Sequence, residues 1–175
     1  MAEKVVGGLK WVKGEIAMTL RRVKGLVETY GKTSEPSALG DAVEALFEVR
    51  GVLLALQLTL PARLVDEMQR LCDAMAERRV RSPGEAAEAM MLALIQLPSH
   101  LDRLDAGAEV LPLSLWPTIN DLRESRGAPP LTPAELLVPG SVLAMEDEDL
   151  PPEALEALAA ALRKVRPHFH RHLVD

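Results

Sequence analysis

The stretch that decides the fold runs from Ala38 to Leu60 and reads ALGDAVEALFEVRGVLLALQLTL. It is the most apolar part of the chain, and small and branched side chains recur along it every three or four residues. Ser34 or Ser37 is placed to cap it, and Pro61 marks its end. We therefore predict a central helix whose core-facing arc consists of Ala42, Ala45, Leu46, Val49, Val52, Leu53 and Leu56.

Four other segments show the same helical periodicity. They are residues 8–30, 61–79, 82–104 and 111–126. The last of these is expected to begin loosely within the stretch from Pro112 to Pro117 and to end at Gly127. Ser82, Pro83 and Glu85 form a strong helix start, with a hydroxyl cap, a proline in the first turn and an acid three residues after the cap. Pro98 lies inside the fourth predicted helix and lacks a backbone donor, which predicts a kink or break near Leu97.

The composition favours an all-helical fold. Aromatic residues make up only 3% of the chain, so strand-favouring side chains are too few to build sheets. Helices that are joined by short loops favour up-and-down antiparallel packing. We therefore predict an all-α fold, in which residues 8–140 form an antiparallel four-helix bundle with an additional fifth helix that covers it.

The last part of the chain is expected to differ from this bundle. The stretch APPLTPAELL, residues 128–137, is interpreted as a connector because it is rich in proline. Residues 141–175 contain the acidic run MEDEDLPPE and a short predicted helix from Pro152 to Arg166. We interpret residues 141–175 as an acidic linker and a helical extension that leads into the rest of a longer protein.

Charge and cysteine content limit the classes of partner and compartment. The formal net charge is −6, and basic residues are scattered among acids, so neither nucleic acid nor membrane insertion is expected. No stretch approaches the roughly 18 uncharged apolar residues that a membrane helix needs. The single Cys72 falls in an apolar helical period, where a thiol packs like another core side chain. We expect a cytoplasmic protein.

Residues capable of catalysis or metal binding are sparse. No GxSxG, GxxxxGKS or GxGxxG motif occurs, so we expect no enzymatic activity, no catalytic residue and no cofactor. His168, His170 and His172 alternate, but alternate residues of a helix diverge by roughly 200° and cannot share one ion, so no metal site is predicted. His100 is an alternative phosphoacceptor, although only Arg103 near it offers a charge that offsets a phosphoryl group.

The central helix also carries a pattern related to phosphotransfer. In histidine phosphotransfer (HPt) domains, a bundle helix has the order His-x-x-Lys-Gly, in which histidine takes the phosphoryl group, lysine offsets its charge and glycine clears space. The matching window here is Phe47-Glu48-Val49-Arg50-Gly51. Arg50 and Gly51 match the cation and glycine positions, whereas Phe47 stands in the histidine position and has no nitrogen to phosphorylate.

Longer motifs extend this comparison along the chain. They are WVKGEI (residues 11–16), VRGVLLALQL (49–58), LIQLPSHLDRL (94–104) and WPTINDLRESRG (116–127). Over about residues 9–137, the chain resembles the N-terminal HPt-like domain of the type IV pilus chemosensory kinases (ChpA/PilL) and of the FimL family. RPHFHRHL (166–173) resembles the stretch that leads these proteins into their next helical region.

The resemblance implies a two-component, chemotaxis-like pathway that controls type IV pili and twitching motility. It also implies a CheY-like response regulator or a pole-localising protein as partner, and a location that extends to the cell pole. Because Phe47 replaces the histidine, we expect a degenerate docking or scaffold domain. The alternatives are an active phosphotransfer protein that uses another histidine and an oligomerisation module of a hybrid histidine kinase.

A second apolar stripe on the central helix gives a candidate binding face. It contains Val43, Phe47, Leu54 and Leu58 and lies largely opposite the core-facing arc. An aromatic anchor inside a charged rim is typical of a protein contact. The alternatives are that the fifth helix covers the stripe or that a homodimer buries it. We name as candidate partner-binding residues Val43, Phe47, Glu48, Arg50, Gly51 and Leu54.

The NDLR part of the WPTINDLRESRG motif is interpreted as structural. We expect Asn120 and Asp121 to satisfy helix ends and Arg123 to pair with an acid of the bundle. Contact with a partner is the alternative for these three residues.

Overall fold

The structure is a computed structural model that describes residues 2–108, 111 and 113–137, with side chains described from residue 8 to residue 136. All regular elements in these residues are helices, which confirms the all-α prediction for this part of the chain. The six helices are α1 (Ala2–Thr33), α2 (Pro36–Ala55), α3 (Thr59–Ala76), α4 (Pro83–Asp105), α5 (Trp116–Ser125) and α6 (Pro133–Leu137). The described residues fall within one unit, residues 1–142.

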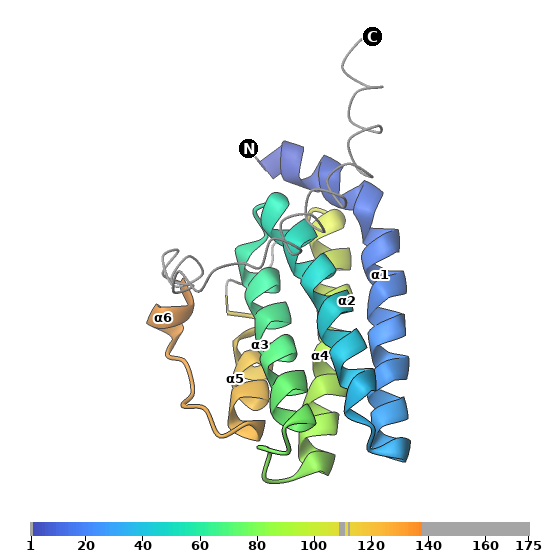
Figure 1. Cartoon of the computed structure of the whole chain (residues 1–175). Coiled ribbons are helices and arrows are strands. Elements are labelled where there is room, and N and C mark those ends of the chain that lie inside the picture. The colour runs from blue at the N-terminus through green and yellow to red at the C-terminus, as the bar shows by residue number, and fades with distance from the viewer. Residues whose placement is uncertain (1, 109–110, 112, 138–175) are drawn as a thin grey trace, which may run out of the picture. The chain divides into compact units, whose positions relative to one another are not determined.

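The first four helices form a helical bundle. α1 packs against α2 and α4, and α3 packs against α2 and α4, so each long helix has two neighbours. Consecutive helices are joined by short connections and run antiparallel (Figure 1). The shorter α5 packs against α3 and α4. None of the described helices combines the length and apolar composition that crossing a membrane requires.

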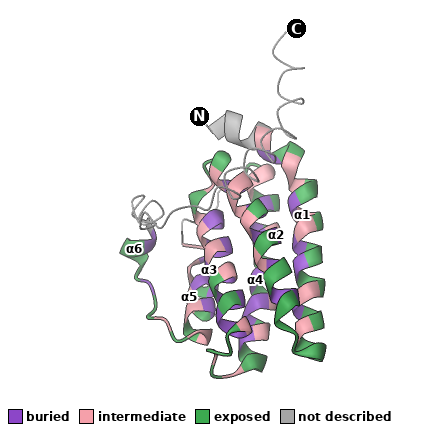
Figure 2. Ribbon diagram, in the orientation of Figure 1, coloured by how far each residue is buried: buried purple, intermediate pink, exposed green. Residues whose placement is uncertain are grey.

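The core lies where the four long helices face one another (Figure 2). In the predicted arc of α2, five residues are buried: Ala42, Ala45, Leu46, Val49 and Leu53. Val52 and Leu56 are only partly buried. Cys72 is buried as predicted, and desolvation, with a smaller contribution from Asp73, raises the pKa of its thiol to about 12.

The end of α2 differs from the prediction. α2 ends at Ala55 and α3 begins at Thr59, so the expected helix to Leu60 is wrong by five residues. Gln57 turns the chain with a left-handed φ of 59°, and the backbone N–H of Leu58 donates to the carbonyl of Leu53 at 2.9 Å. This hydrogen bond closes the helix by a turn that apolar periodicity does not reveal.

Cap predictions succeed at one helix and fail at another. Ser82 precedes α4, and its Oγ accepts a hydrogen bond from the backbone N–H of Glu85 at 3.3 Å, as predicted. α2 instead follows Glu35, which makes no side-chain cap hydrogen bond, so neither Ser34 nor Ser37 caps it. Ser34 has a φ of 56° and belongs to the turn that ends α1.

Pro98 does not break α4. The helix is continuous from Pro83 to Asp105, so, of the predicted kink or break near Leu97, the break is absent. Leu97 and Leu101, on either side of the proline, are both almost fully buried. Packing on both sides of Pro98 offsets the one backbone hydrogen bond that the proline removes.

The region after α4 also differs in detail from the prediction. α5 begins at Trp116, inside the stretch from Pro112 to Pro117 where a loose start is predicted, and the chain leaves it at Gly127 with a φ of 75°. α6 forms inside the stretch that was interpreted as a connector. Its start is a capping box, because Thr132 Oγ1 accepts from the N–H of Glu135 at 3.3 Å and Glu135 Oε2 accepts from the N–H of Thr132 at 2.8 Å.

Several predictions concern residues outside the described part of the chain. They include the linker and extension at residues 141–175, the helix from Pro152 to Arg166 and the histidines at positions 168, 170 and 172. These remain predictions.

Candidate partner-binding face on the second and third helices

Four of the candidate residues lie along one line of α2. Val43, Phe47, Arg50 and Leu54 are three or four residues apart, and a helix places such residues on one side. All four are partly buried, and Val43 and Leu54 pack against the edge of the core. We call this set of four residues the α2 line.

The α2 line borders α3. Arg50 Nε lies 3.5 Å from Asp66 Oδ1, and Gln69 Nε2 donates a hydrogen bond to the carbonyl of Val43 at 3.3 Å. The side chain of Arg50 is only 11% exposed. The border between α2 and α3 is therefore a mixed surface in which apolar side chains of α2 meet polar side chains of α3.

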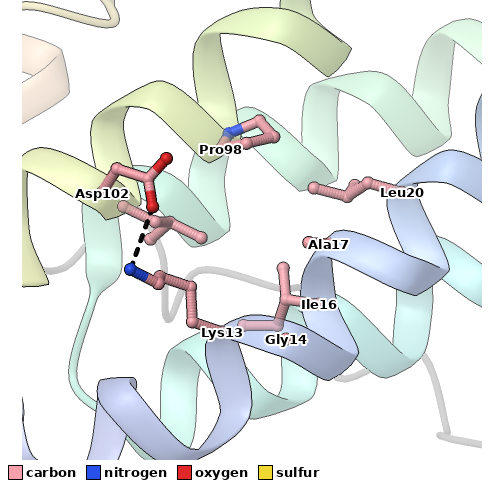
Figure 3. A pocket seen from close by; sticks show the side chains of 8 residues that line it. Lys13, Gly14, Ile16, Ala17, Leu20, Pro98 and Asp102 are labelled. Atoms are coloured by element: carbon pink, nitrogen blue, oxygen red, sulfur yellow. Dashed lines mark ion pairs between the residues drawn. The ribbon is translucent and has the colours of Figure 1, made fainter.

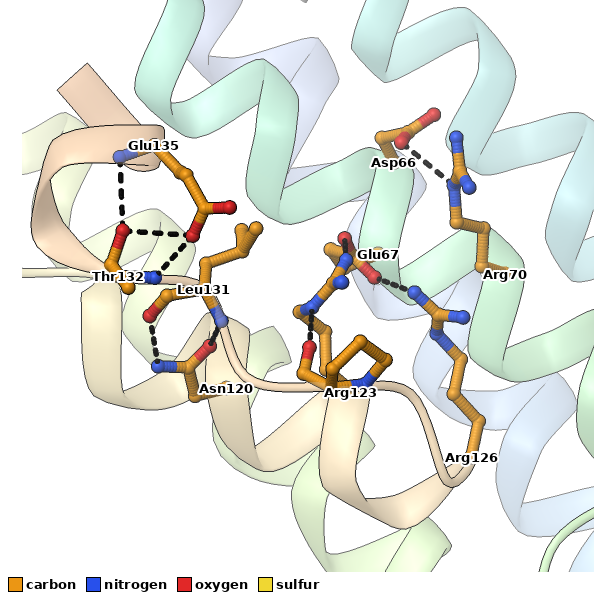
Figure 4. Close-up of polar contacts among 10 residues, drawn as sticks. Asp66, Glu67, Arg70, Asn120, Arg123, Arg126, Leu131, Thr132 and Glu135 are labelled. Carbon is orange, nitrogen blue, oxygen red and sulfur yellow. Dashed lines mark hydrogen bonds and ion pairs between the residues drawn. The ribbon is translucent and has the colours of Figure 1, made fainter. Parts of the chain in front are cut away.

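Asp66 is shared between two cations. Its Oδ2 also accepts a hydrogen bond from Nε of Arg70 at 3.0 Å (Figure 4), four residues further along α3. The carboxylate therefore lies between the guanidinium groups of Arg50 and Arg70. The positive charge that occupies the cation position of the phosphotransfer pattern is partly neutralised inside the protein.

Of the other two candidates, Gly51 borders this line and Glu48 lies off it. Gly51 is four residues after Phe47 and three before Leu54, so it lies on the same side of α2, and it is partly buried. Glu48 is two residues before Arg50 and thus about 200° away around the helix, and its side chain is exposed. The structure therefore brings five of the six candidate residues to one side of α2 and places Glu48 on another side.

The WPTINDLRESRG motif fixes the chain that follows α5. The Asn120 side chain makes two hydrogen bonds to the backbone of Leu131. Its Oδ1 accepts from the Leu131 N–H at 2.8 Å, and its Nδ2 donates to the Leu131 carbonyl at 3.1 Å. Trp116 Nε1 donates to the same carbonyl at 2.8 Å. Asn120 therefore satisfies an irregular segment, not the helix end that the sequence suggested, and Asp121 is exposed.

The same motif supplies a buried ion cluster. Glu67 of α3 is almost fully buried, and its two oxygens accept from Arg123 Nη1 and Arg126 Nη2, each at 2.6 Å (Figure 4). Arg123 Nε also donates to the carbonyl of Pro129 at 2.8 Å. The prediction that Arg123 pairs with an acid of the bundle is confirmed. The contacts of this motif attach α5 and residues 129–131 to α3.

His100 is in an interior position. It is the only histidine among the described residues, is 6% exposed, and its Nδ1 lies 3.2 Å from Ser114 Oγ. Burial lowers the pKa of His100, and the nearby Arg103 adds to this effect. A receiver domain that transfers a phosphoryl group needs an exposed ring, which this position does not offer.

Sequence reasoning did not identify the α3 side of the face. Asp66, Gln69 and Arg70 were not among the candidates, although the spacing of Asp66 and Arg70 fits an ion pair on one helix and is readable in the sequence. The pairing of Asp66 with Arg50 depends on the rotation of α2 against α3. Within the part of the chain that the structure describes, no group of three metal-ligating side chains comes together.

Comparisons with known proteins found no matching protein-family model, no matching curated protein and no matching solved structure.

Proposed function

We propose that this chain is a non-catalytic, degenerate HPt-like docking or scaffold domain of a two-component chemosensory pathway that regulates type IV pili and twitching motility. In this proposal, α1 to α4 correspond to the four-helix bundle of a histidine phosphotransfer domain. The face between α2 and α3 binds a CheY-like response regulator or a pole-localising protein in the cytoplasm, at the cell pole. The assignment to this pathway is based on the motifs that resemble the pilus kinases and FimL.

The position of Phe47 carries the proposal. This aromatic side chain is partly exposed at the border of α2 and α3, beside the Arg50–Asp66–Arg70 ion pairs. A partly exposed aromatic residue within a polar and charged rim has the composition of a binding hot spot. α5 packs against α3 and α4, so its main contacts lie on another side of the bundle.

The charges around Phe47 favour docking over phosphotransfer. A phosphoryl group adds close to two negative charges and needs a cation that is available to it. Arg50 is instead held beside Asp66, whose carboxylate would repel a phosphoryl group at this place. The one described histidine, His100, is buried on α4.

A binding titration tests the face. The full chain is titrated with each purified CheY-like receiver domain of the host, and the heat of binding is measured. We expect one receiver to bind, and Phe47→Ala to weaken binding about thirtyfold, which corresponds to about 2 kcal/mol for a hot-spot residue. Leu92→Ala is the matched control because Leu92 is an exposed apolar residue of α4. Equal losses for both variants would contradict the proposal.

A phosphorylation assay separates docking from phosphotransfer. The chain is incubated with a receiver charged by acetyl phosphate, and acid-labile phosphohistidine is mapped. We expect none on the unmodified chain, and phosphohistidine at His100 would overturn the non-catalytic assignment. In Phe47→His, phosphorylation at position 47 would show that the receiver's active site approaches this face, which supports docking there.

A measurement of mass in solution tests the homodimer alternative. If a homodimer buries the α2 line, Phe47→Glu converts the dimer to a monomer, because a charge in an apolar interface is costly. A monomeric unmodified chain that binds a receiver supports the docking proposal instead.

A further inference from the structure

The face between α1 and α4 contains a pocket of about 140 Å³. Figure 3 shows Pro98 of α4 facing Ala17 and Leu20 of α1, with the ion pair of Lys13 and Asp102 at one end. An apolar cavity of about 150 Å³ holds a benzene molecule, so this pocket has room for one bulky apolar side chain.

Small side chains leave this space open. A Cβ atom added at Gly14 would meet no atom within 4 Å, and Ala17 is another small residue of α1 that lines the pocket. Lys13 joins the two helices at this end, with Nζ 3.0 Å from Asp102 and 2.6 Å from Asp105. Hydrogen bonds, first to Asp105 and then to Asp102, raise the pKa of Lys13, so its ammonium group stays charged. These ion pairs link α1 and α4 at one end of the pocket.

Exposed apolar side chains flank the pocket on both helices. Met18 of α1 is 52% exposed and follows Ala17 directly. Ile95 of α4 is 69% exposed and lies about one turn before Pro98. A single exposed apolar residue is ordinary on a protein surface, but Met18 and Ile95 each lie within about one turn of residues that line the pocket, so they extend its apolar surface. We call the pocket with Met18 and Ile95 the α1/α4 groove.

The helix that forms one wall of this groove, α1, has an excess of basic residues in an otherwise acidic protein. α1 has seven basic and three acidic residues, whereas the whole chain has a net charge of −6. Arg21 and Arg22, one turn beyond Met18, are exposed and form no ion pair with any residue that the structure describes. Lys24 is paired with Glu28 at 3.8 Å. The two arginines are therefore available to negative charges of another molecule.

We propose that the α1/α4 groove docks an acidic amphipathic helix of a partner protein. One bulky apolar side chain of that helix enters the pocket, neighbouring apolar residues cover Met18 and Ile95, and its Asp or Glu residues lie beside Arg21 and Arg22. Because α1 and α4 are neighbours, as are α2 and α3, this groove is on the opposite side of the bundle from the α2 line. The chain therefore has room for two partners at once, and this inference does not depend on the function of the α2 line.

A synthetic helical peptide tests the groove. The probe is a short stapled peptide with leucines one turn apart on one face and glutamates beside them, and its lysine counterpart is the control peptide. Binding to the full chain is followed by fluorescence anisotropy, and the site is mapped by amide chemical shifts. We expect shifts at Gly14, Ala17 and Ser99, and at least about tenfold tighter binding of the glutamate peptide than of the lysine peptide, with affinity that falls as salt rises.

Matched glycine variants locate the binding within α1. Gly14→Leu fills the mouth of the pocket, and it should fold because a Cβ atom there meets no atom within 4 Å and leucine favours a helix. We expect it to weaken binding at least about tenfold, as we do for the double variant Arg21→Glu/Arg22→Glu. Gly31→Leu is the control, since Gly31 is in equally open space at the other end of α1. Phe47→Ala should leave peptide affinity unchanged.

Four results would overturn the inference. They are equal affinity for the two peptides, no detectable binding of the glutamate peptide, the same affinity in Gly14→Leu as in Gly31→Leu, and shifts confined to α2 and α3. A receiver that still binds the α2 line while the peptide fails would separate this inference from the proposed function.

Discussion

Asp66 and Glu67 are neighbours in α3, yet each of them lies between two arginines in a very different environment. The Glu67 side chain is 4% exposed and contacts Arg123 and Arg126 at 2.6 Å. The Asp66 side chain is 29% exposed and lies 3.5 Å from Arg50 and 3.0 Å from Arg70. Both are carboxylates, so the difference comes from which helices pack over them.

This comparison separates a structural cluster from a surface cluster. Removal of one member of a buried ion cluster leaves an uncompensated charge in the interior, which is strongly destabilising. A partly exposed pair is screened by water and contributes little to stability. Stability should therefore depend on Glu67, whereas Asp66 can be changed with little effect on folding and can serve recognition.

The largest effect is expected for Glu67→Gln. The amide is nearly the same size but carries no charge, so Arg123 and Arg126 lose their shared counter-ion. We expect the free energy of unfolding to fall by about 3 kcal/mol, because a buried pair has lost one partner. Urea denaturation at neutral pH measures it. A loss of unfolding free energy below about 1 kcal/mol would mean that the Glu67 cluster contributes no more to stability than a surface pair such as that of Asp66.

A smaller loss of about 2 kcal/mol is expected for Asn120→Ala. The change removes both hydrogen bonds from Asn120 to the Leu131 backbone and leaves the Leu131 N–H without its side-chain acceptor, although Trp116 still donates to the carbonyl. Amide hydrogen exchange at Leu131 should become faster, while exchange in α1 stays unchanged. Asp121→Ala is the control, since Asp121 is exposed on the same helix. If Leu131 keeps its protection in Asn120→Ala, the proposed attachment is incorrect.

A pH-dependent effect is expected at His100. The pKa of His100 is lowered in the folded protein, so below about pH 6.5 the unfolded chain takes up a proton that the folded chain resists. His100 therefore makes the free energy of unfolding fall as pH drops through this value. The stability difference between the unmodified chain and His100→Gln should shift in favour of the variant from pH 7.5 to pH 5.5. A constant difference would argue against a buried, neutral His100.

The smallest effect on stability is expected for Asp66→Asn. The change should cost less than about 1 kcal/mol, because the pair is partly exposed. Its effect should be on recognition, since it removes the negative charge that lies between Arg50 and Arg70. Receiver affinity measured at low and high salt should therefore change more than the denaturation midpoint does. A larger loss of stability than in Glu67→Gln would reverse the comparison.

Much of the fold follows from local sequence patterns. The cap at Ser82, the core arc of α2 and the burial of Cys72 were predicted because each depends on residues within a few positions in the chain. The capping box that begins α6 is also a local pattern, because it depends only on Thr132 and Glu135. It was not predicted because the surrounding prolines led us to interpret the stretch as a connector. The end of α2 was not predicted because Gln57 takes a left-handed conformation. Glutamine, unlike glycine, does not favour that conformation, so the sequence gives no sign of it.

Only the α2 side of the candidate face could be predicted from the sequence. The spacing of Val43, Phe47, Arg50 and Leu54 determines by itself that they share one side of a helix, because helical geometry is local. Which helix that side meets was decided by tertiary packing. The rotation of α3 turns Asp66 toward Arg50 and the next residue, Glu67, into the interior against Arg123 and Arg126. Two adjacent acids differ in role because neighbouring residues of a helix point about 100° apart and face different parts of the bundle.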